Sequence, residues 1–120
     1  MANPNIATLT DIRGKSAGLA VTTSATAIVT NSSGSNKVFK INSLIIANVN
    51  GTSAADVTVD LFKNQSTAFD LAFTITVPAD ATLVVISKDT QIYLEENDSI
   101  RITASANSVL EAVCSWEEIA

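Results

Sequence analysis

The sequence contains no histidine, and this absence removes much of the usual chemistry of enzymes. Histidine is the commonest general base near neutral pH and the commonest side-chain ligand of transition metals. Nucleophile arrangements that pair serine or cysteine with histidine are excluded as well. The four glycines form no phosphate-binding loop. The chain is therefore predicted not to be an enzyme and to carry no cofactor, and any catalysis would have to rest on carboxylates.

Cysteine is almost absent, because Cys114 is the only one. The fold must therefore be stable without an internal disulfide, which suits maturation in a reducing cytoplasm. Cys114 shares a strand face with Leu110 and Trp116, so it is predicted to be a core thiol rather than a reactive one. No apolar run is long enough to span a bilayer, and the N-terminus lacks the features of a secretory signal.

Charge is scarce, since only 16% of the residues are charged and the net charge is −5. The seven basic residues are scattered along the chain and form no cluster that could neutralise a run of phosphates. This argues against a nucleic-acid partner and against binding to an anionic membrane. A surface so poor in charge also hints that neighbouring proteins cover part of it.

What the sequence does have is repeated alternation of apolar and polar residues, which is typical of half-buried antiparallel strands. The clearest run places five apolar residues on one predicted inward face: Phe69, Leu71, Phe73, Ile75 and Val77. Similar runs cover 56–61 and 100–105, and the last strand is predicted over 109–119. In the stretch 37–49 one predicted face carries Phe39, Ile41, Ile45, Ala47 and Val49, and the other carries Leu44 and Ile46. Two apolar faces suggest a central strand, or one covered on both sides.

Turn signals separate these runs at short intervals, and weaker strands are expected near 19–22 and 25–30. About eight strands with no helical period predict an all-β fold, a single antiparallel β-sandwich of about 120 residues. Residues 1–18 are polar and alternate only weakly. We expect them to form an extended N-terminal arm beside a sandwich domain over 19–120.

Carboxylates and aromatic rings are the remaining candidates for a binding site. The acidic turn Glu95–Asp98 could hold Ca²⁺ through oxygen ligands, but it lacks the spacing of a known Ca²⁺ loop, and a solvated hairpin turn is the better interpretation. Asp56 and Asp60 share a strand face but stand about 13 Å apart at the rise of a strand. Most aromatic rings fall at inward positions, and Phe62 is the exception, a candidate surface contact. No metal site is predicted.

Two stretches carry a resemblance to a known group of proteins. Residues 92–105 (Ile-Tyr-Leu-Glu-Glu-Asn-Asp-Ser-Ile-Arg-Ile-Thr-Ala-Ser) and 110–119 (Leu-Glu-Ala-Val-Cys-Ser-Trp-Glu-Glu-Ile) resemble the end of small structural proteins of tailed-phage virions, cyanophage proteins among them. Residues 37–48 resemble an earlier strand of the same proteins. The resemblance implies a jelly-roll sandwich and a role in capsid decoration (cement) or in the neck or tail. It brings no catalytic residues.

Three functions are therefore carried forward. The first is a capsid decoration protein on the virion surface, an oligomer such as a trimer that binds the major capsid protein. Its N-terminal arm would contact a neighbour's sheet edge through Asn3, Ile6, Leu9 and Ile12. The second is a neck or tail component that joins other virion proteins. The third is a carbohydrate- or receptor-binding module that uses Ca²⁺ at the acidic turn.

Overall fold

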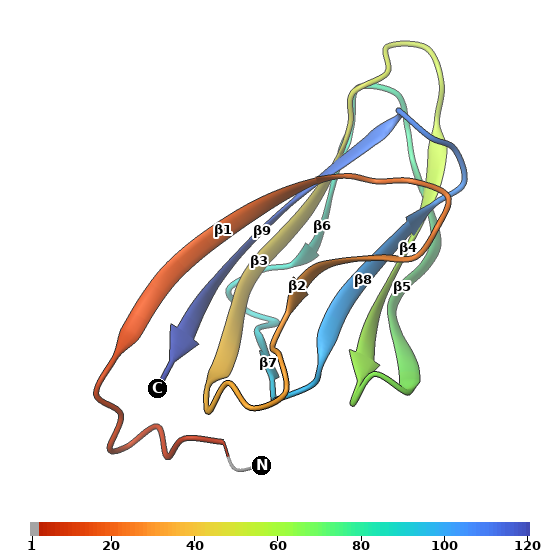
Figure 1. The fold of residues 1–120 in the computed structure, drawn as a ribbon. Helices are drawn as coiled ribbons and strands as arrows, with labels where there is room; N and C mark the ends of the chain where they lie inside the picture. Colours follow the sequence, from red (N-terminus) through yellow and green to blue (C-terminus); the bar gives the residue numbers. More distant parts are fainter. Residues whose placement is uncertain (1–2) are drawn as a thin grey trace.

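Nine strands arranged in two antiparallel sheets make up the chain, and the computed structural model describes residues 3–120 (Figure 1). The strands are β1 (Ile12–Ala20), β2 (Thr26–Thr30), β3 (Val38–Asn48), β4 (Ala55–Lys63), β5 (Thr67–Val77), β6 (Thr82–Ile86), β7 (Ile92–Leu94), β8 (Ser99–Ala104) and β9 (Leu110–Ile119). No helix within the described range is long and apolar enough to cross a membrane.

The strand order confirms the predicted jelly roll. One sheet has the order β1-β9-β3-β6, with β7 also pairing with β3, and the other has the order β2-β8-β4-β5. Successive strands thus alternate between the sheets at the beginning of the chain and again at its end, the pattern of two interleaved Greek keys. The edges are β1 and β6 in the first sheet and β2 and β5 in the second.

The core lies between the sheets and follows the predicted alternation most closely in β9 and β8. Leu110, Ala112, Cys114 and Trp116 are all buried, and Trp116 stacks on Phe39 with ring centroids 6.3 Å apart. On the opposing sheet, Val57, Val59, Ile100 and Ile102 are completely buried. These side chains come from central strands, where both neighbours and the facing sheet exclude water.

Strand β3 is central, as predicted, but its two apolar faces have a local cause. The register between β3 and β9 shifts between Ile41 and Ser43, which leaves Asn42 as an extra residue in a β-bulge. The bulge transfers the inward face from Phe39 and Ile41 to Leu44 and Ile46, all of which are buried. Strict alternation would have placed Leu44 on the same face as Lys40, so the assignment of the second half of this strand was wrong.

The predicted N-terminal arm over 1–18 is shorter in the structure. Residues 12–18 belong to β1, which pairs with β9 from Ile12 opposite Ile119 to Ala20 opposite Glu111. Alternation is weak there because the charged residues Arg13 and Lys15 occupy the positions of β1 opposite the buried residues Glu118 and Trp116. The arm is thus reduced to residues before 12, of which Met1 and Ala2 lie outside the described residues.

Asparagine side chains hold several of the connecting turns. Asn31 is completely buried, and its amide group donates to the carbonyl groups of Lys37 and Leu94 at 2.8 and 3.0 Å. Asn48 does the same at the other end of the sandwich, donating to Ser53 and Val77 at 2.9 and 3.0 Å. In these turns the backbone carbonyl groups have no partner in a β-ladder, and the asparagine side chains supply their hydrogen bonds.

Candidate interaction surfaces

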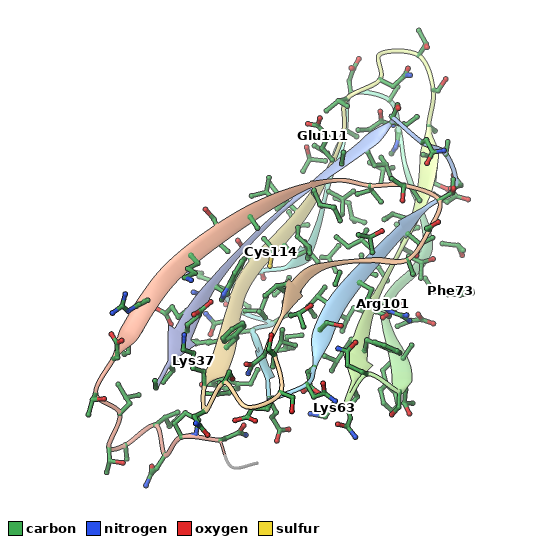
Figure 2. The ribbon with its side chains drawn as sticks, viewed as in Figure 1. Lys37, Lys63, Phe73, Arg101, Glu111 and Cys114 are labelled. Atoms are coloured by element: carbon green, nitrogen blue, oxygen red, sulfur yellow. The ribbon has the colours of Figure 1, made fainter. Side chains whose placement is uncertain are left out.

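The free edge of the second sheet carries a row of apolar side chains, here called the β5 row: Phe69, Leu71, Phe73 and Ile75. Their exposed fractions are 57, 39, 65 and 41%. The sequence predicted that these residues face the core, and this prediction was wrong for all four. Only Val77, at the end of the strand, is buried. Figures 1 and 2 show β5, and Phe73 with it, at the side of the sandwich away from β1.

Two features of β5 account for this exposure. Its register with β4 shifts on both sides of Val59, so Leu71, Phe73 and Thr74 have no partner in the ladder and lie in bulges. Thr74 has a φ of 46°, a left-handed conformation that a bulge imposes on its strand. Phe69 and Ile75 keep inward register opposite Leu61 and Val57, but β5 is an edge strand and the opposing sheet covers it poorly there.

The predicted contact residue Phe62 lies on the outer face of the second sheet, under an ion pair. Arg101 Nε and Nη2 donate to the two carboxylate oxygens of Asp60 at 2.9 and 3.2 Å. The guanidinium carbon lies 3.7 Å from the centre of the Phe62 ring, a cation–π contact. Phe62 is therefore half-buried by its own chain and presents little free apolar surface.

The predicted contact residues of the arm lie close to the sandwich. Asn3 donates to Glu95 at 3.1 Å, and the backbone of Thr10 and Asp11 donates to the carbonyl of Ala120 at 2.8 and 3.0 Å. Leu9 is half-buried, whereas Ile6 and Ile12 are more than half exposed. The segment folds back in a turn at residues 6–7 rather than extending away from the domain.

The acidic turn Glu95–Asp98 is occupied by a lysine of the same chain. Lys63 Nζ lies 2.7 Å from oxygens of both Glu95 and Asp98, and Asp98 also accepts backbone bonds from Asn64 and Glu95 at 2.9 and 3.0 Å. Burial alone would lower the pKa of Lys63, but its bonds to the two carboxylates outweigh that and raise it above 10.5. The hydrogen bond from Lys63 lowers the pKa of Glu95 below 4.5. These carboxylates neutralise a lysine rather than forming an open Ca²⁺ site.

Glu118, the second-to-last residue of β9, is buried. It accepts from Lys37 at 3.1 Å and from the Trp116 indole at 3.3 Å, and Lys15 lies 3.5 Å away. Burial alone would raise the pKa of Glu118, but these bonds and charges outweigh it and hold the pKa below 4.5. Glu118 therefore contributes stability that is present at pH values above its unfolded pKa and is lost as the pH falls through its folded value.

We expect the Glu118→Gln variant to lose less stability on acidification than the wild type. Urea denaturation at about pH 5 and about pH 3 measures that loss as the difference in unfolding free energy. The same substitution at Glu111, an exposed residue of the same strand, is the control and should leave the difference unchanged. Equal acid sensitivity of Glu118→Gln and wild type would contradict the role given to this carboxylate.

Two further groups were examined as candidate nucleophiles. Cys114 is completely buried, as predicted, and burial raises the pKa of its thiol to about 12, so it is unreactive in the folded chain. The segment Gly14-Lys-Ser-Ala-Gly18 fits the Gly-x-Ser-x-Gly pattern of hydrolases. It lies inside β1, in register with β9, and not at the strand-to-helix turn which exposes such a serine.

Within residues 3–120, no three acidic, cysteine or histidine side chains are grouped closely enough to hold a metal ion. One open hollow on the surface is lined by the arm, β3 and β7, including Pro4, Ile6, Val38 and Tyr93. The β5 row is therefore the feature of the surface that most needs an explanation. In comparison with known proteins, no family model matches the chain, and the search of curated proteins finds no match.

Proposed function

We propose that the protein is a structural component of a phage virion and acts as a capsid decoration protein, bound to the capsid surface as a homo-oligomer. The observation that carries the proposal is the β5 row, four large apolar side chains on a free edge strand of eleven residues. A long apolar edge left bare invites pairing with other chains. Its presence supports a protein that works in contact with other proteins.

A second apolar surface also supports the proposal that the protein binds other proteins. On the outer face of the other sheet, Val84 and Val113 are about half exposed, and both are in register with Ile45 of β3 between them. The neighbouring outward positions of β1 are Gly14, Ser16 and Gly18. The middle of this face is uncharged, with Glu111 at one end and Glu117 and Lys40 at the other, so it offers a patch for contact with another protein such as a capsid subunit.

The proposed mechanism is stabilisation by selective binding. A decorator that binds the assembled capsid and not its free subunits stabilises the assembly by mass action. A symmetric oligomer presents each contact several times, so individually weak contacts add up to tight binding on a repetitive lattice. The rigid sandwich, with a core between two antiparallel sheets, loses little conformational entropy when it binds.

Deletion of the gene from the phage that encodes this chain tests the proposal. We expect particles with normal tails whose heads release DNA at lower temperature or lower salt than wild-type heads, and restored stability when purified protein is added to them. Detached or unfinished tails would instead assign the chain to the neck or tail, the main alternative. Unchanged particles would refute both structural roles.

A carbohydrate-binding module is the second candidate, and one observation favours it. Phe69, Phe73 and Tyr93 are about half exposed or more, whereas the sequence predicted that aromatic rings face inward, and exposed rings can stack on sugars. A glycan array probed with and without Ca²⁺ tests this function. Binding that disappears in Phe73→Ala would support it, and absence of binding under both conditions would remove it.

A further inference from the structure

The β5 row is large enough to be part of a specific interface. Its four side chains together expose on the order of 400 Å² of apolar surface, if each large apolar side chain is taken as roughly 200 Å². Two such rows facing each other would bury about 800 Å², and stable interfaces bury about 1,200–2,000 Å² in total. Backbone and flanking polar groups of the same strand would supply the remainder. An interface of this size is expected to be reversible.

The other exposed edges of the described chain do not match this row. The strands β2 and β6 have five residues each, against eleven in β5. The strand β1 has nine, but it carries Gly14 and Gly18 and exposes only Ile12 among large apolar side chains. The segment before β1 is bonded to Glu95 and to the C-terminus. A strand with the same length and the same apolar side chains as β5 is therefore offered by β5 of a second copy of the chain.

The sequence of β5 is self-complementary when two copies run antiparallel. With Ala72 on the two-fold axis, residues whose numbers add to 144 face each other. Leu71 then lies opposite Phe73 of the second copy, and Phe69 lies opposite Ile75. Asp70 lies opposite Thr74, so the two copies of Asp70 are not brought face to face. Every large apolar residue of the row meets another one, and no like charges are opposed.

We propose that the β5 row is a two-fold homodimer interface, in which the β5 strands of two copies run antiparallel about Ala72. The bulges of β5 turn Leu71 and Phe73 out of the intramolecular ladder, which makes these side chains available to the second copy. Because bulges also limit regular pairing at an edge, the contact consists mainly of side-chain packing with a short ladder. Two four-stranded sheets are thereby joined side by side.

This dimer does not depend on the proposed role in a virion, since it is a property of the purified chain. It is measured as mass in solution by sedimentation or light scattering over a range of concentrations. We expect a shift from monomer to dimer at micromolar or higher concentration. A mass that stays monomeric to about 1 mM, or that rises to a trimer, would overturn the proposal.

Phe73→Asp tests the surface, and Val84→Asp is its matched control. Both residues are large, apolar and similarly exposed, at 65 and 58%, but Val84 lies on β6 of the other sheet. We expect Phe73→Asp to weaken dimerisation at least tenfold and Val84→Asp to leave it unchanged, with both variants melting within a few degrees of the wild type. Equal weakening of dimerisation by the two variants would overturn the proposal that the β5 row forms the dimer interface.

The register is tested at Thr74, whose left-handed backbone accepts Asp and Asn readily. Thr74→Asp places a carboxylate opposite Asp70 of the second copy, and Thr74→Asn is its uncharged equivalent. We expect dimerisation several-fold weaker for Thr74→Asp than for Thr74→Asn, and recovery when Asp70→Asn is added to Thr74→Asp. Identical dimerisation of the two Thr74 variants would overturn the register about Ala72.

Discussion

Replacing Asp98 by alanine should lower the free energy of unfolding by about 3 kcal/mol. The Asp98 side chain is only 2% exposed, and its carboxylate accepts from Lys63 Nζ and from two backbone N–H groups, those of Asn64 and Glu95. Alanine leaves all three donors without this partner and removes the charge that balances Lys63. Because Asn64 lies between β4 and β5 and Glu95 between β7 and β8, the variant loosens the contact between two turns.

Glu95→Ala is the control for this prediction, because Glu95 bonds to the same lysine. Its side chain is 54% exposed, and exposed ion pairs contribute less than about 1 kcal/mol. Urea denaturation monitored by Trp116 fluorescence measures both variants. Equal losses of unfolding free energy for Asp98→Ala and Glu95→Ala would contradict the prediction. They would show that Asp98 stabilises the fold through its ion pair with Lys63 and not through its bonds to the backbone.

Leu44→Ala is the second substitution with a large expected effect, a loss of about 3 kcal/mol in unfolding free energy. Leu44 is completely buried and lies opposite Cys114 of β9. Removing three carbons there, a methine and two methyl groups, leaves a cavity between the two sheets that they cannot close. Thermal or urea denaturation measures the loss.

The neighbouring residue provides the contrast that makes this prediction informative. Ile45 is half-buried on the outer face, so Ile45→Ala should cost only about 1 kcal/mol. Uninterrupted alternation from Phe39 and Ile41 would bury Ile45 and expose Leu44. A larger loss for Ile45→Ala than for Leu44→Ala would therefore contradict the bulge at Asn42 and the inward face that follows from it.

The fold was predictable from the sequence to the extent that alternation was unbroken. In β9, a run of ten residues without a bulge, the predicted inward residues Leu110, Ala112 and Cys114 are all buried. In β3 the same reasoning failed at the bulge, because one extra residue reverses the faces of everything that follows. In β5 it failed because Leu71 and Phe73 lie in bulges, and because Phe69 and Ile75, although in inward register, are exposed at the sheet edge. Nothing in the residue types of β5 marks its bulges, and they depend on pairing with β4.

The interaction surface was harder to predict than the fold, for a related reason. The spacing of Phe69, Leu71, Phe73 and Ile75 is that of a core strand, and they are exposed by the position of β5 at a sheet edge together with its bulges. Strand order is set by contacts distant in sequence, so it could not be deduced from local patterns. Conversely, Phe62 was expected on the surface, but Arg101 covers it from the neighbouring strand.

In the proposed dimer, β5 is a free edge strand only in the isolated chain and is covered by β5 of a second copy when two chains associate. Hydrogen exchange of residues 67–77, measured on the purified protein at low and at high concentration, tests it most directly. We expect β5 amides to exchange more slowly at high concentration, whereas amides of β1, an edge strand of the other sheet, should exchange at the same rate in both samples. Exchange in β5 that does not depend on concentration would contradict it.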